Sequence, residues 1–289
     1  MPPEQSLQDA AQAMVAAAEN GRSVVSVLKR LCPHIYQQIR RDARYPELLS
    51  LWGRSVNVDE NVDQIIVHPA ILRAIGSLAG VPMRGRVVYA GLQHTYGYLF
   101  SLIDTPYGAK RDRWLSTDME RGFGIDLTLL GDQPRSGTLL ANLTWLLGQI
   151  VFRDRPRLRQ QLEANASAVA PGLLRYDYAR LEVCRIMEQV VLPGKPAREV
   201  SLVTDLLRYP HRPADTTKDD TLLIYSIQQG EKSTLKLITA FPVRPATVRE
   251  LRASVRRGKV QIRPRYNAYV RGFPPAALPG RRFLAEPCS

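Results

Sequence analysis

The chain has 289 residues, of which 45% are hydrophobic and 23% charged, and it carries a formal net charge of +13. This composition is ordinary for a globular protein, and the length suits one large domain or two modest ones. No apolar run approaches the ~20 residues needed to cross a bilayer, and the start of the chain lacks the basic and apolar regions of a signal peptide. Three widely spaced cysteines (Cys32, Cys184 and Cys288) predict neither a zinc site nor a disulfide framework, so we expect a cytoplasmic protein.

The first part of the chain is predicted to be helical. Residues 6–31 place apolar side chains at intervals of three and four, which is the helical period, and Gly21 interrupts them. Residues 32–54 predict a second helical region that breaks near Pro46, and residues 67–82 predict a short helix between prolines.

The middle of the chain is less uniform. Residues 85–103 fit either a strand or a buried helix, because periodicity does not separate the two in short apolar runs. Residues 136–152 are apolar around most of a helical circumference, which predicts a buried helix. Residues 153–169 and 172–193 are amphipathic and are also predicted to be helices.

The pattern changes towards the C-terminus. Residues 219–243 form two β-rich runs around Gly230, which predicts a hairpin. A short basic helix is expected over 245–258, an edge strand over 259–270 and a proline-rich tail after it. The fold class is therefore α+β: a mainly helical body over 1–200 that carries the candidate site, then a smaller basic β-hairpin region over 201–289, packed on the body, with a small antiparallel sheet and a basic helix.

Common catalytic motifs are missing from the sequence. It has no glycine-rich nucleotide loop, no Walker A loop, no paired zinc-binding histidines and no nucleophile elbow. None of the four histidines has a second histidine or a cysteine at a zinc-ligand spacing. We therefore expect no metal and no cofactor, although ligands from distant positions can still converge in space.

Residues 91–114, GLQHTYGYLFSLIDTPYGAKRDRW, combine ionisable side chains with aromatic rings. Polar groups that converge beside apolar walls are typical of ligand sites. The first hypothesis gives His94 or Asp104 the acid–base role and makes Tyr107 a hydrogen-bond donor. The alternatives are a core or surface histidine and a solvated charged turn. The side chains predicted to bind an anionic substrate are Tyr96, Lys110, Arg111, Arg113, Trp114 and Arg121.

The second candidate is the basic C-terminal segment. Residues 232–285 hold 13 Lys and Arg against a single acid, Glu250, with aromatic residues between them. Basic groups neutralise phosphates and rings stack on unpaired bases, so the segment predicts RNA contact, with a solvated charged face as the alternative. This hypothesis assigns RNA contacts to Arg256, Arg257, Arg263 and Tyr266, among others.

Residues 236–243, KLITAFPV, resemble the strand that ends bacterial EndoU-type and RelE-like nuclease domains. The likeness covers eight of the 289 residues. It implies that His211 is the general base and that Lys236 and Thr239 face phosphate.

Three functions follow as hypotheses. The first is a metal-independent enzyme that acts on a small carboxylate or phosphate by hydrolysis, group transfer or elimination. The second is an RNA-binding protein or ribonuclease that works through residues 232–285, and the third is a non-catalytic protein-interaction module. No membrane partner is expected, and the sequence leaves the oligomeric state open.

Overall fold

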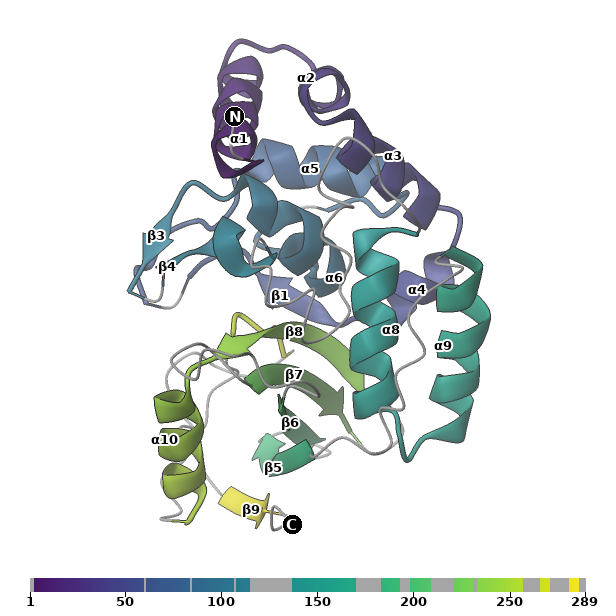
Figure 1. The fold of residues 1–289 in the computed structure, drawn as a ribbon, viewed down its shortest axis with the longest axis vertical. Helices are drawn as coiled ribbons and strands as arrows, with labels where there is room; N and C mark the ends of the chain where they lie inside the picture. The colour runs from purple at the N-terminus through teal and green to yellow at the C-terminus, as the bar shows by residue number, and fades with distance from the viewer. Residues whose placement is uncertain are drawn as a thin grey trace.

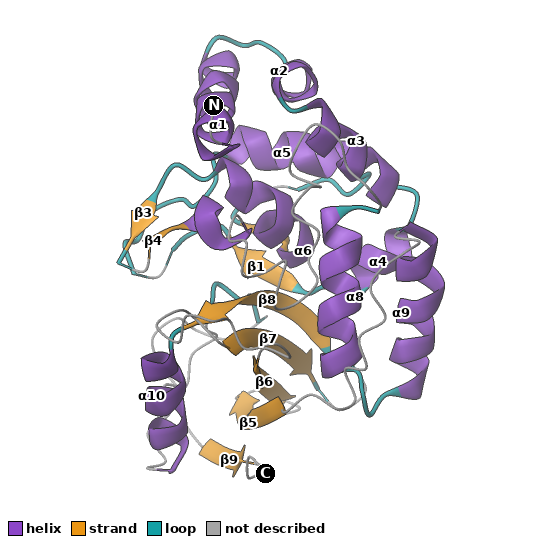
Figure 2. Cartoon of the chain, viewed as in Figure 1, coloured by secondary structure: helices purple, strands orange, loops and turns teal. Residues whose placement is uncertain are grey.

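A computed structural model describes residues 3–59, 61–83, 85–106, 108–114, 137–169, 183–192, 198–208, 221–230, 233–256, 266–270 and 281–285 of the chain. These residues form the predicted α+β fold, with most helices first and an antiparallel sheet after them (Figures 1 and 2). No helix among them is long and apolar enough to span a membrane.

The N-terminal helices confirm the prediction made from the helical period of apolar residues. The first predicted region divides into α1 (Pro3–Glu19) and α2 (Val24–Leu31), with Gly21 at φ +66° between them. The second region divides at Pro46, as expected. The remaining helices of this layer are α3 (Pro33–Asp42), α4 (Pro46–Ser50) and α5 (Pro69–Leu78).

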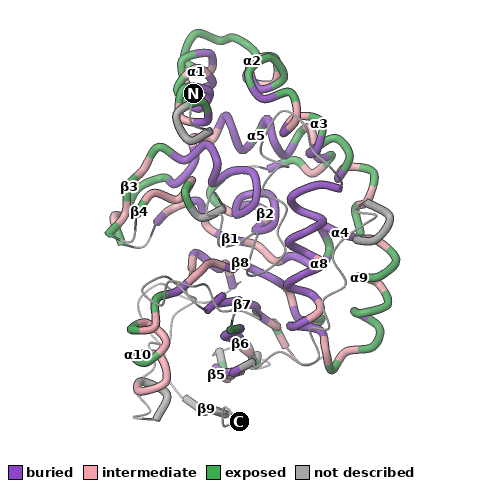
Figure 3. Tube along the Cα trace, viewed as in Figure 1, coloured by how far each residue is buried: buried purple, intermediate pink, exposed green. Residues whose placement is uncertain are grey.

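The ambiguous stretch 85–103 contains a strand and then helical turns. β2 (Val87–Tyr89) pairs with β1 (Arg54–Val56). It is followed by α6 (Ala90–Leu92), the π-helix η1 (Gln93–Gly97) and the 3₁₀-helix η2 (Tyr98–Phe100). Every residue of these three helical turns is buried, and Figure 3 shows them at the centre of the helical layer.

Gly91 of α6 is required by close packing. A Cβ at this position would lie 2.7 Å from Cγ of Trp52, so only glycine lets the indole reach its place. There Trp52 donates from Nε1 to Oγ1 of Thr144 at 2.8 Å. Thr144 belongs to α8 (Leu139–Val151), the buried helix that the sequence predicts, and α9 (Pro156–Val169) packs beside it.

The C-terminal half is built on a five-stranded antiparallel sheet with the order β8-β7-β6-β5-β9. The predicted hairpin is confirmed as β7 (Thr221–Gln229) and β8 (Lys236–Val243). The prediction of a helix over 172–193 is wrong for the residues described there, because 183–192 form β5 (Val183–Leu192), which pairs with β6 (Arg198–Arg208). The sheet therefore begins well before residue 200.

The last strand also departs from the prediction. Residues 281–285, expected to lie in a tail, form β9 (Arg281–Ala285), which pairs with β5. On β5, Cys184 is disulfide-bonded, so the expectation of no disulfide is wrong. Cys32 is a buried free thiol, and Cys288 lies outside the described residues.

The sheet packs directly on the helical body. Gly53 N donates to Leu237 O at 2.7 Å, and Leu237 N donates to Leu51 O at 2.9 Å, so β8 is hydrogen-bonded to the chain just before β1. α8 contacts β7 and β8, whereas α10 (Pro245–Arg256) lies on the other side of the sheet in Figure 1. The basic helix predicted over 245–258 is thus confirmed as far as residue 256.

Candidate functional site

The two stretches that the sequence offers as separate sites meet in space. Nδ2 of Asn267 donates to Oη of Tyr98 at 3.1 Å, and η3 (Lys110–Trp114) contacts β8. Residues 266–270 run beside β1, where Ala268 forms a bridge with Ser55. We call this junction the seam: the described residues of 93–114, β8 and 266–270.

A left-handed turn holds the seam at its C-terminal side. Tyr266 and Asn267 have φ values of +57° and +63°. This conformation is uncommon for asparagine and a genuine outlier for a bulky tyrosine. It places the Tyr266 ring 5.2 Å from the Tyr225 ring and 5.0 Å from the Phe241 ring, both edge-on. Tyr266 and Phe241 are half-buried and pack against the core, whereas Tyr225 is fully buried.

His94 lies on the other side of the seam, in the π-helix η1. Its side chain is 1% exposed, and its ring centroid is 4.5 Å from that of Tyr98. π-Helical turns cost hydrogen-bond geometry and occur frequently at functional sites. The position therefore fits a role in a site, but one that a solute reaches only if neighbouring groups move.

Lys110 of the predicted anion clamp is engaged inside the protein. Nζ of Lys110 lies 2.6 Å from Oδ2 of Asp59, whose side chain is 1% exposed. Burial alone would raise the pKa of Asp59, but hydrogen bonds from Lys110 and Asn61 and the Lys110 charge outweigh it and lower that pKa. Arg111 is 3.7 Å from Asp112 and donates to Ser101 O at 3.4 Å. Lys110 is thus committed to Asp59, and Arg111 is the more accessible cation.

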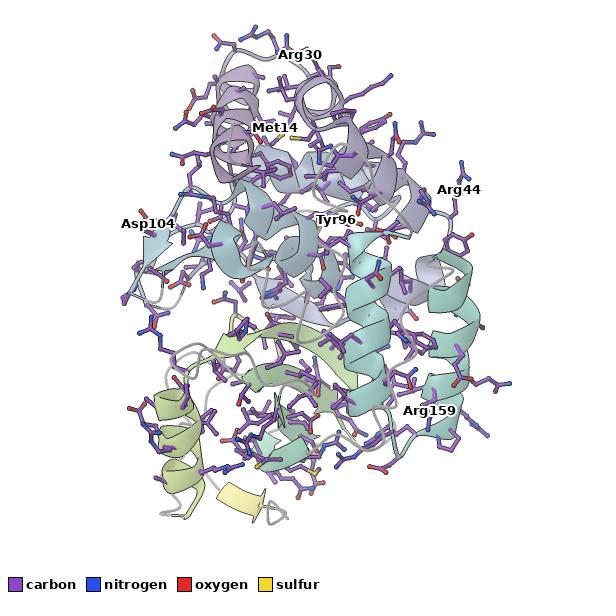
Figure 4. The ribbon with its side chains drawn as sticks, in the orientation of Figure 1. Met14, Arg30, Arg44, Tyr96, Asp104 and Arg159 are labelled. Atoms are coloured by element: carbon purple, nitrogen blue, oxygen red, sulfur yellow. The ribbon has the colours of Figure 1, made fainter. Side chains whose placement is uncertain are left out.

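Tyr96 is placed deeper than the hypothesis assumed. It is fully buried at the centre of the helical body, and its hydroxyl donates to Oδ2 of Asp42 at 2.5 Å (Figure 4). Burial, the Asp42 charge and the hydrogen bond to it raise the pKa of Tyr96 well above its usual value. This hydroxyl serves an internal contact rather than one with an exposed ligand.

Asp104 lies at the edge of the molecule, away from Tyr96 in Figure 4. The predicted turn is confirmed as a hairpin of β3 (Asp104–Thr105) and β4 (Gly108–Ala109), with Gly108 at φ +92°. Asp104 is exposed, and no hydrogen bond or ion pair joins it to His94 within the described residues. Tyr107 and Arg121 lie outside those residues, and only the backbone of Arg113 and Trp114 is described, within η3.

The structure describes two of the three residues implied by the nuclease resemblance, Lys236 and Thr239. Nζ of Lys236 donates to Ser50 O at 2.5 Å, and burial lowers the pKa of Lys236. Thr239 is fully buried and lies opposite Tyr225 in the sheet. Thr239 therefore does not face solvent, whereas Lys236 is half-buried. His211, Arg257 and Arg263 lie outside the described residues, as does the side chain of Arg256.

The basic helix α10 carries several arginines near the surface. Val248 and Leu251 pack against the core, while Arg244 and Arg249 are exposed and Arg252 is half-buried. None of these three arginines forms an ion pair with any acid that the structure describes, and Nε of Arg252 is buried without an acceptor there. Other exposed arginines, such as Arg22 and Arg30, also form no ion pair with a described acid, whereas Lys110 and Arg185 have carboxylate partners.

Sequence reasoning missed Asp42, Asp59 and Asn267. Isolated acids read as surface residues because charged side chains are seldom fully buried, yet both carboxylates are at most 1% exposed. Asn267 follows a tyrosine in a segment expected to be an edge strand. Its one available signal is that asparagine tolerates the left-handed conformation better than most residues.

Neither a metal-binding cluster nor similarity to known proteins assigns this chain to a family. The described part of the chain contains no group of three His, Cys, Asp or Glu side chains placed to hold a metal ion. No protein-family model, curated protein or solved structure matches this chain.

Proposed function

We propose that this protein binds single-stranded RNA through a surface formed by the α10 arginines Arg244, Arg249 and Arg252 and the half-exposed rings of Phe241 and Tyr266. We call this the basic–aromatic surface. The observation that carries the proposal is the combination of three arginines without acidic partners among the described residues and a nearby half-buried aromatic pair, Phe241 and Tyr266.

Charge and chemistry support this class of ligand. Arginines without carboxylate partners keep their charge available for phosphates, and each phosphate they neutralise releases counterions. Phe241 precedes Arg244 by three residues, so a ring and a cation are close along the chain. Aromatic rings stack on unpaired bases of any sequence, whereas an acidic protein would gain little from them. The excess positive charge of residues 232–285 also favours a negatively charged ligand such as RNA.

Binding of a fluorescent single-stranded RNA to paired charge-reversal variants tests the proposal. Arg244→Glu with Arg249→Glu changes the charge of the basic–aromatic surface by four units, and both side chains are exposed, so folding should be preserved. The matched control is Arg22→Glu with Arg30→Glu, two exposed arginines, one just before α2 and one in its last turn. Figure 4 shows Arg30 at the opposite end of the molecule from α10. We expect the first pair to weaken binding by at least tenfold and the control to change it little. Equal losses would refute a localised surface, and no RNA binding by the wild type would refute the proposal. A polyglutamate peptide that binds in place of RNA would identify an acidic protein as the partner.

A second candidate, an enzyme for a small anionic substrate, is favoured by the buried His94 in a π-helix, because the Tyr98 ring that it contacts also lies 5.7 Å from Nζ of Lys110. Arg111 is the residue of the predicted clamp that a substrate could reach, because its side chain is 18% exposed. Inorganic phosphate or malonate should then raise the melting temperature of the wild type by mass action, and should not do so for Arg111→Ala. If neither anion stabilises the wild type, this candidate loses its support.

A further inference from the structure

Residues 20–46 carry a second concentration of positive charge, separate from the basic–aromatic surface. They contain six Lys and Arg and a single acid, Asp42. This acid does not reach the surface, because its side chain is 0% exposed and accepts hydrogen bonds from the hydroxyls of Tyr96 and Thr138. All six cations are exposed, and we call them the α2–α3 face: Arg22, Lys29, Arg30, Arg40, Arg41 and Arg44.

The helix α3 directs its cations to one side. Its apolar positions are buried in the core, whereas Gln37, Arg40 and Arg44 are exposed and follow one another at spacings of three and four residues. The helical turn continues past the end of α3, because Arg44 N donates to Arg41 O at 3.0 Å. Arg40 and Arg44 are therefore neighbours on the same side of the chain, about one turn apart.

This pair of arginines is not neutralised within the described part of the protein. Like charges four residues apart on a helix repel each other, and neither Arg40 nor Arg44 forms an ion pair with an acid that the structure describes. The α3 dipole favours cations in the last turn of the helix, which holds Arg40 and Arg41, but Arg44 lies beyond that turn. Carboxylates from another molecule would relieve the repulsion.

The groups beside these cations fit a protein partner better than RNA. Leu31, the last residue of α2, is 43% exposed and offers an apolar contact that a phosphate backbone does not use. Tyr36 packs against the core, and Nζ of Lys29 lies 5.8 Å from its ring centroid, so a cation already covers that ring where a base would stack. Arginine is enriched at protein interfaces, and its planar fork matches a carboxylate.

We propose that the α2–α3 face docks an acidic segment of a partner protein, whose carboxylates pair with Arg40 and Arg44 and whose apolar side chains cover Leu31. Figure 4 shows Arg30 and Arg44 along the edge of the molecule that carries α2 and α3, and Figure 1 shows α10 far from that edge. The face is therefore separate from the basic–aromatic surface, and the inference does not depend on RNA binding.

A fluorescent peptide of glutamates with regularly spaced leucines is the probe. The wild type should bind it, and Arg40→Glu with Arg44→Glu should weaken binding by about tenfold or more, because two charged hydrogen-bond partners are lost. The matched control is Arg244→Glu with Arg249→Glu, which makes the same change of net charge on α10 and should bind the peptide as the wild type does. A peptide with lysines in place of the glutamates should bind the Arg40→Glu, Arg44→Glu protein more tightly than the wild type.

The neutral pair Arg40→Gln with Arg44→Gln keeps the test available if the charge-reversed protein does not fold, and it should also weaken binding of the glutamate peptide. The proposal is refuted if the wild type does not bind this peptide, if the α3 and α10 pairs lose equal affinity, or if the neutral pair binds as the wild type does. Loss of RNA binding without loss of peptide binding in the Arg40→Glu, Arg44→Glu protein would also overturn it, and would assign the α2–α3 face to RNA.

Discussion

Asn267 donates a hydrogen bond to the phenolic oxygen of Tyr98 at 3.1 Å, across 169 residues of sequence. Both side chains are at most 9% exposed. The bond joins the segment that the sequence nominated for catalysis to the one it nominated for RNA. A ligand at either place would therefore act on the same seam.

The Tyr98–Asn267 pair should be energetically coupled. Tyr98→Phe and Asn267→Ala should each lower the free energy of unfolding by about 1–3 kcal/mol, because each leaves a buried polar partner without its bond. The double variant should lose less than the sum of the two. Denaturant unfolding of the four proteins measures the coupling, with Tyr89→Phe as the control, since Tyr89 is half-buried with its ring against Arg54. Additive losses would show that the contact contributes nothing.

Lys110→Met should destabilise the protein by about 3–5 kcal/mol, because it leaves the Asp59 carboxylate buried without its cation. The folded-state pKa of Asp59 is lowered, so this group stabilises the fold above its unfolded pKa, and that stability is lost as pH falls through the folded pKa. The penalty of Lys110→Met should therefore shrink at acid pH. Lys29→Met, on the exposed face of α2, is the control. Unchanged stability together with lost phosphate binding would instead return Lys110 to the predicted clamp.

Thiol chemistry checks the correction made for the cysteines. In denatured and unreduced protein a thiol reagent should modify Cys32 but not Cys184, because Cys184 is disulfide-bonded. In the native protein Cys32 should react slowly, since burial raises its pKa to about 11 and the thiol stays protonated. Three reactive thiols in unreduced, denatured protein would show that the disulfide does not form.

Most of the longer helices were predictable because their apolar positions recur with the helical period, and α8 because it is apolar around most of its circumference. β5 was not, because its ten residues sit in a stretch whose apolar positions also fit a helix, and a buried acid, Glu188, stands where an apolar residue is expected. Residues 183–192 are recognised as a strand only from their pairing with β6 and β9. The candidate site was predictable in composition but not in geometry. Carboxylates from distant positions, Asp42 and Asp59, engage the tyrosine and lysine that were assigned to a ligand.

The salt dependence of RNA binding tests the central claim most directly. The logarithm of the association constant should fall linearly with the logarithm of salt concentration, and the slope reports the phosphates neutralised. Arg244→Glu with Arg249→Glu should flatten that slope by about one unit for each phosphate that the variant no longer neutralises, while Arg22→Glu with Arg30→Glu should leave it at the wild-type value. A slope that is the same in the wild type and both double variants would contradict the basic–aromatic surface as the RNA site.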